Sequence, residues 1–154
     1  MKVTWLDVHK TVNRMTLYLE QVHSMNRLFG HTIVGISRGG LVPAVMLSNR
    51  FEDLPFQIVQ VQRYHGEKMQ WKTFKEIVKD ATYHLNKGPY IFIDDICDEG
   101  LTFRALDLAK SDEDNLYCCL VWRNNERSQF KPNYAGMTID SKEWVVFPWE
   151  KTQS

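Results

Sequence analysis

Three short apolar runs constrain the fold of this chain more than any other feature of its sequence. They are TIVGIS at 32–37, PYIFIDD at 89–95 and NLYCCLVWR at 115–123. Runs of four to eight residues rich in β-branched and aromatic side chains, without polar alternation, are typical of strands covered on both faces. Such strands belong to parallel sheets, because the connecting helices lie against both faces of the sheet.

Segments with helical features separate these runs. The segment 4–29 has apolar residues at spacings of three and four, with Thr4 as a candidate N-cap, Asp7 in the first turn and Gly30 after the end. Further helices are expected at 41–51, 74–85 and 102–110, further strands at 57–64 and 144–149, and a polar loop at 65–73. The order of elements predicts an α/β fold with a mostly parallel central sheet flanked by helices.

Length and composition favour one globular domain. The chain has 154 residues, 44% of them hydrophobic, and its nineteen basic and nineteen acidic residues cancel. A neutral chain has no overall field that would attract nucleic acid, and no apolar run approaches the ~20 residues of a membrane span. The N-terminus lacks the apolar region of a signal peptide, and Cys97, Cys118 and Cys119 are odd in number. Both features favour a cytoplasmic protein, with the cysteines as core residues.

Two loops are expected at the carboxyl ends of strands, where ligands bind in open α/β sheets. The first is SRGG at 37–40. Its glycines allow close approach of the backbone to a ligand, the following helix offers its electropositive N-terminus, and Arg38 adds a forked cation suited to phosphate oxygens. Taken alone, a glycine pair between a strand and a helix is more often only a turn.

The second loop, at 94–102, combines acids with a helix start. Backbone N–H groups of residues 98–102 can form an anion site, Gly100 permits the tight turn, and Thr102 is expected as N-cap. Asp94 and Asp95 should point to opposite sides of an extended chain, so that one holds hydroxyls or a hydrated Mg²⁺ while the other faces structural neighbours. The alternative is a solvated acidic loop with an ordinary cap. Together, the two loops favour a pocket for a phosphorylated sugar.

These residues also carry a resemblance to a known family. IFIDDICDEGLTF at 91–103 resembles the phosphoribosyl pyrophosphate (PRPP) signature of class I phosphoribosyltransferases, and GISRGGLVPA at 35–44 resembles their pyrophosphate loop. The VTW start and the WVVFPW end at 144–149 are similar to the family's bacterial xanthine-guanine members. The resemblance implies a class I phosphoribosyltransferase-like domain over 1–154, with a core of about 1–122 and a small C-terminal hood from about 123–154.

The resemblance implies roles for the residues that would bind PRPP. Asp94 and Asp95 would hold the ribose hydroxyls, and Asp95 would also contact Mg²⁺, mainly through PRPP and water. The remaining PRPP-binding and phosphate-binding residues would be Ser37, Arg38, Gly39, Gly40, Glu99, Gly100, Leu101 and Thr102.

The base would be bound from the C-terminal half. Asp98 would be the catalytic residue, near N7 of a purine, where it would accept the proton of the base. Trp144 would stack on the ring and the Val145 backbone would recognise its edge. Arg123 stands where the family has a lysine directed at the exocyclic oxygen of the purine, and is the candidate for that contact.

The implied activity is Mg²⁺-dependent transfer of the 5-phosphoribosyl group from PRPP to a 6-oxopurine base in purine salvage, by a homodimer or homotetramer. Glu99 departs from the family, which has Thr or Ser there, and a carboxylate would repel a 5′-phosphate unless its side chain turns away. Two alternatives therefore stay open: a non-catalytic regulator that binds PRPP or nucleotides, and a transferase for another base. The role of Trp71 is also open.

Overall fold

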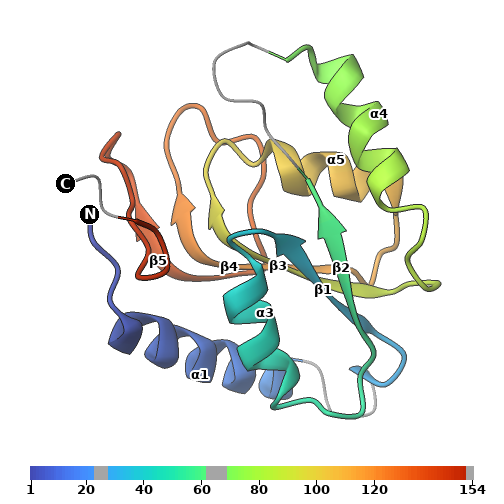
Figure 1. Cartoon of the computed structure of the whole chain (residues 1–154), viewed down its shortest axis with the longest axis horizontal. Helices are drawn as coiled ribbons and strands as arrows, with labels where there is room; N and C mark the ends of the chain where they lie inside the picture. The colour runs from blue at the N-terminus through green and yellow to red at the C-terminus, as the bar shows by residue number, and fades with distance from the viewer. Residues whose placement is uncertain (23–27, 62–68, 152–154) are drawn as a thin grey trace.

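The computed structural model describes residues 1–22, 28–61 and 69–151. Within them, one five-stranded sheet has the order β2-β1-β3-β4-β5, and every neighbouring pair of strands is parallel (Figure 1). The strands are β1 Thr32–Ser37, β2 Phe56–Gln60, β3 Tyr90–Cys97, β4 Leu116–Arg123 and β5 Tyr134–Ile139. The predicted α/β fold with a parallel central sheet is therefore confirmed.

Helices cover both faces of the sheet, as the apolar strands predict. Helices α1 (Trp5–Val22) and α3 (Leu41–Ser48) lie on one face, and α4 (Trp71–Ala81) and α5 (Leu101–Ala109) lie on the other (Figure 1). In β3, Ile91 and Ile93 pack with α1 and α3, while Phe92 packs with α4 and α5. Alternate residues of one strand thus enter two separate cores. None of the helices that the structure describes is long and apolar enough to cross a membrane.

The predicted cap of α1 is confirmed. The Asp7 backbone N–H donates to the Thr4 hydroxyl oxygen at 3.1 Å, and the Asp7 carboxylate accepts from the Thr4 N–H at 2.8 Å. This reciprocal pair satisfies donors that a helix start otherwise leaves open. The expected helix continues through 23–27, which lie outside the described residues.

Several predicted boundaries differ from the structure. Helix α3 ends at Ser48 and not at residue 51, and α4 begins at Trp71, so 71–73 are helical and not part of a polar loop. Strand β2 ends at Gln60. The end of the predicted strand 57–64 and the start of the predicted loop 65–73 fall at residues 62–68, which lie outside the described part of the chain.

The prediction of a strand at 144–149 is wrong. This segment makes only an isolated parallel bridge between Val146 and Lys2, with the Val3 N–H donating to the Val146 carbonyl at 2.9 Å. Its apolar residues are explained by packing, because Val145 and Phe147 enter a cluster with Val3. The sequence prediction also missed β5, so the expected hood segment 123–154 contributes a strand to the central sheet.

Candidate active site

The two loops singled out in the sequence meet where the chain order of the sheet reverses. From β1 the chain passes to β2 on one side, and from β3 it passes to β4 on the other. Connections that diverge from neighbouring strands leave a crevice at their carboxyl ends. A cavity of about 390 Å³ opens there, and its walls include Ser37, Gly39, Asp94, Asp95, Asp98, Glu99, Gly100, Leu101, Thr102, Arg123, Trp144, Val145 and Glu150.

The loop after β1 lies close against the acidic end of β3. A Cβ atom on Gly39 would lie 1.8 Å from Oδ2 of Asp95, so only glycine leaves the Asp95 carboxylate in its place. A Cβ atom on Gly40 would lie 2.4 Å from the Ile93 carbonyl oxygen, which belongs to the sheet itself. Gly40 is therefore needed for close packing of the loop on β3, and Gly39 leaves room for the Asp95 carboxylate.

Asp94 and Asp95 are both among the residues that border the cavity, and the Asp95 carboxylate lies on the side of the loop after β1. The Asp94 carboxylate folds back and accepts from the Asp95 N–H at 2.9 Å, and the Asp95 carboxylate accepts from the Ile96 N–H at 2.7 Å. Burial raises the pKa of Asp94 well above its ordinary value, and the negative charge of Asp95 raises it further. Burial also raises the pKa of Asp95. A cation or hydroxyl donors in the cavity would relieve this concentrated charge.

The loop between β3 and α5 has the backbone geometry of an anion site. Gly100 takes a left-handed conformation with φ of 81°, and a Cβ atom there would lie 2.6 Å from the Cβ of Phe130. Gly100 precedes α5, whose first internal bond runs from the Arg104 N–H to the Gly100 carbonyl at 3.0 Å. The earlier N–H groups of the helix start have no acceptor within the helix and can bind an anion.

The predicted N-cap at Thr102 is wrong. Helix α5 begins at Leu101, so Gly100 occupies the cap position and makes no side-chain cap bond, while Thr102 lies in the first turn and borders the cavity. The physical reason is the left-handed turn at Gly100, after which the helix starts at Leu101, one residue before Thr102.

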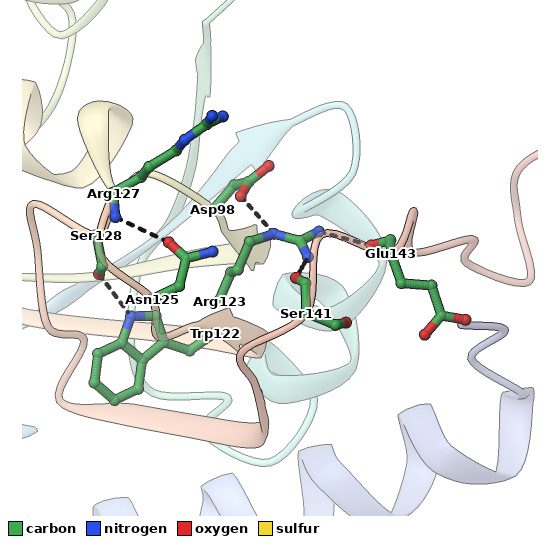
Figure 2. Close-up of polar contacts among 8 residues, drawn as sticks. All are labelled: Asp98, Trp122, Arg123, Asn125, Arg127, Ser128, Ser141 and Glu143. Atoms are coloured by element: carbon green, nitrogen blue, oxygen red, sulfur yellow. Dashed lines mark hydrogen bonds and ion pairs between the residues drawn. The ribbon is translucent and has the colours of Figure 1, made fainter.

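Asp98 and Arg123 form an ion pair at the edge of the cavity (Figure 2). Nε of Arg123 donates to Oδ1 of Asp98 at 2.7 Å, Nη2 donates to the Glu143 carbonyl at 3.0 Å, and Nη1 donates to the Ser141 carbonyl. Each of the three nitrogens of the Arg123 guanidinium therefore donates to an acceptor of the protein.

The C-terminal segment forms the opposite wall. Trp144 is 74% exposed and Val145 is buried. The Trp144 carbonyl accepts from the Met1 amino group at 2.7 Å, which holds the segment against the N-terminus. A second, more open hollow of about 1060 Å³ adjoins the cavity and includes Arg38, Gly39, Trp144, Glu150 and Lys151 in its walls.

Residues 13–152 match the family described as phosphoribosyl transferase domain. The chain belongs to the phosphoribosyltransferase family. Among its curated relatives, a protein named xanthine-guanine phosphoribosyltransferase from Gluconobacter oxydans is 29% identical over 150 residues, which cover 96% of this chain and 83% of the relative. A protein of the same name from Cereibacter sphaeroides is 23% identical, over 96% of this chain and 85% of its own length.

Solved structures agree on the fold of this phosphoribosyltransferase. A crystal structure of purine phosphoribosyltransferase from Pyrococcus horikoshii superposes with a TM-score of 0.73 at 23% identity, covering 100% of this chain and 95% of that one. At this identity, the likeness shows the class I phosphoribosyltransferase fold alone.

The structure of this phosphoribosyltransferase brings most of the predicted site residues to one cavity. Arg38 is exposed and borders the adjoining hollow. Gly40 is buried beneath the loop. The roles given to individual residues by the resemblance stay predictions.

Sequence reasoning missed two parts of this phosphoribosyltransferase site. Glu150 borders both hollows, and its negative charge adds to the rise in the pKa of Asp95, after the larger effect of burial. Phe130 lies behind Gly100 and fixes the turn. Neither has a sequence signal, because Glu150 follows the last matched tryptophan and Phe130 lies in a stretch without strand or helix periodicity.

Proposed function

We propose that this protein transfers the 5-phosphoribosyl group from PRPP to a 6-oxopurine base, releasing pyrophosphate and forming a nucleoside 5′-monophosphate. One observation carries the proposal: a helix-start anion site, a pair of half-buried carboxylates and an exposed tryptophan border the same cavity. Phosphate, ribose hydroxyls and a flat base need these three surfaces. The names of the curated relatives support a purine as acceptor.

The backbone of residues 100–102 binds the 5′-phosphate. Glu99 borders the cavity, and the loop is braced there through its main chain, because the Gln129 N–H donates to the Glu99 carbonyl at 2.8 Å. Leu101 packs on the hydrophobic core, so its bulk is accommodated. The phosphate is thus held by N–H groups that do not depend on the side chains at 99 and 101.

The carboxylate pair fits a magnesium ion that arrives with the substrate. Mg²⁺ binds through one or two carboxylates together with substrate phosphates and water. Among the described residues, no group of three His, Cys, Asp or Glu side chains could hold a metal ion by itself. Asp95, with Asp94 beside it, would therefore hold the ion jointly with PRPP. When bound, the ion supplies positive charge that neutralises the departing pyrophosphate.

The protein aligns the base and the sugar for displacement at the anomeric carbon. A new bond forms from a ring nitrogen of the base to this carbon, the bond to the pyrophosphate oxygen breaks, and pyrophosphate leaves with the electron pair. Carboxylates stabilise the oxocarbenium-like character of such a reaction centre. Asp98 accepts the proton that the base loses, and Trp144 holds the ring in place by stacking.

The experiment is a panel of single bases with PRPP and Mg²⁺, in which released pyrophosphate is measured. Turnover with guanine, xanthine or hypoxanthine and none with pyrimidine or nicotinate-type rings is expected. Turnover with another ring alone would assign a different acceptor. PRPP binding by calorimetry without pyrophosphate release from any base would refute the enzyme and indicate a regulator.

A further inference from the structure

The guanidinium of Arg123 joins three separate parts of the chain. Its donors reach the carboxylate of Asp98 in the loop after β3, and the carbonyls of Ser141 and Glu143 in the C-terminal segment (Figure 2). The side chain of Arg123 is 10% exposed, against 45% for Asp98. A buried cation is stable only when it is paired and hydrogen-bonded; here Arg123 is paired with Asp98, and three of its five N–H groups have protein acceptors.

The backbone that carries the Arg123 side chain is fixed in the sheet. Arg123 is the last residue of β4 and lies in register with Ile139 of β5, and the next N–H, that of Asn124, donates to the Ile139 carbonyl at 2.8 Å. The guanidinium is planar, with donors in fixed directions, so it can hold three acceptors at defined places. A lysine ammonium is a single point of charge on a flexible stem and cannot reproduce this geometry.

Both elements proposed to contact the base are attached to this one side chain. Oδ1 of Asp98 accepts the hydrogen bond from Arg123, so Oδ2 remains available to a ligand. The two carbonyls belong to the residues that lead directly into Trp144 and Val145, which border the same cavity. Movement of Arg123 would therefore displace the proton acceptor and the stacking wall together.

This arrangement conflicts with a direct contact between Arg123 and the exocyclic oxygen of a purine. Each of the three guanidinium nitrogens already donates to a protein acceptor. Little of the side chain remains exposed to a ligand.

We propose that Arg123 is a positioning residue, which holds Asp98 and the segment 141–145 in register for the base, and that it does not recognise the exocyclic oxygen. The proposal deepens the proposed function and rests on it for its kinetic consequence. Its structural consequence, the attachment of two loops to the end of β4, is independent of any substrate.

The kinetic test compares Arg123→Lys and Arg123→Met with the wild type. Lysine keeps a cation that can donate to a base oxygen but loses the planar set of guanidinium donors. If Arg123 recognised the exocyclic oxygen, Arg123→Lys would keep its activity, whereas a positioning role predicts that the activity falls. We expect kcat to fall about 10- to 100-fold in both variants, since a misplacement of about 1 Å at a reacting group can cost about 100-fold. The KM for PRPP should stay within about threefold, because the phosphate loop is braced separately by Gln129.

Arg50→Lys is the matched control. Arg50 donates to Asn13 at 2.7 Å on the exposed surface, away from the cavity. Its kinetics should equal those of the wild type.

Hydrogen–deuterium exchange of the free protein provides the second readout. Peptides that cover 98–101 and 141–146 should exchange faster in Arg123→Lys than in the wild type, while peptides from α1 stay unchanged. If Arg123→Met does not fold, Arg123→Lys alone provides both the kinetic and the exchange measurements.

Wild-type kcat in Arg123→Lys, or unchanged exchange in the two peptides, would overturn the proposal. If the wild type releases no pyrophosphate with any base, the proposed function fails, and the exchange result alone decides whether Arg123 holds the two loops.

Discussion

Gly39→Ala should abolish most of the proposed activity at little cost in stability. A Cβ atom at this position would lie 1.8 Å from Oδ2 of Asp95, whereas such contacts are essentially never shorter than 3.0 Å. The carboxylate must therefore move by at least 3.0 − 1.8 = 1.2 Å. The obstructing atom is the end of a side chain, so the loop and the strand can keep their places.

The expected magnitude follows from this displacement. Moving a group that orients the substrate by about 1 Å can cost about 100-fold in rate, so kcat/KM for PRPP should fall by about that factor. The shift also breaks the bond from the Ile96 N–H to Asp95, which is 2.7 Å long. One such hydrogen bond contributes about 0.5–1.5 kcal/mol, and the free energy of unfolding should fall by that amount.

A double-mutant cycle with Asp95→Ala tests the reasoning. PRPP affinity in the presence of Mg²⁺ is measured by calorimetry for the wild type, both single variants and the double variant. Since Asp95→Ala removes the obstructed carboxylate, adding Gly39→Ala to it should change the affinity little. An equal loss from Gly39→Ala in both backgrounds would show that the methyl group blocks the ligand itself, and would refute the displacement of Asp95.

Four further predictions address the rest of the site. Gly40→Ala should lower the free energy of unfolding by about 1–3 kcal/mol in urea, because its Cβ would lie 2.4 Å from a main-chain oxygen that cannot yield; unchanged stability would contradict this. Asp94→Asn should raise the Tm of the free protein at pH 8. Because the pKa of Asp94 is raised in the folded state, wild-type stability is lost as pH rises above the ordinary value of 3.8, so the advantage of the variant should vanish near pH 4. Asp98→Asn should reduce kcat by about 100- to 10,000-fold with PRPP affinity preserved in calorimetry, and near-normal turnover would exclude it as proton acceptor. Trp144→Ala should raise the KM for the base by roughly 5- to 150-fold, equivalent to about 1–3 kcal/mol of stacking, and leave unfolding within about 0.5 kcal/mol because the side chain is 74% exposed.

The sequence predicted the buried strands well because their patterns have one physical cause. A parallel strand needs apolar side chains on both faces, and residues 32–37 and 115–123 show this directly. The crevice also followed, since the loops after β1 and β3 lie at the carboxyl ends of neighbouring strands.

Two elements could not be predicted from local pattern. Strand β5 contains Gly136, whose Cβ would lie 2.0 Å from the Thr11 side chain of α1, so its composition reflects close packing by a helix. The apolar segment 144–149 has the composition of a strand, yet its side chains Val145 and Phe147 are buried without a ladder. Tertiary packing overrode local preference in both cases.

Within the site, sequence identity is informative only where a particular residue type is physically required. Glycine is required at 39 and 100, by the contact with Asp95 and by the positive φ, and both positions could be singled out from the sequence. Residue 99 is braced through its main-chain carbonyl, and the partners of Arg123 include two further carbonyls. Any residue type supplies a carbonyl, so such contacts leave no trace in a sequence. A departure from a family motif at residue 99 therefore leaves this main-chain contact intact, whereas replacement of Gly100 would strain the turn itself.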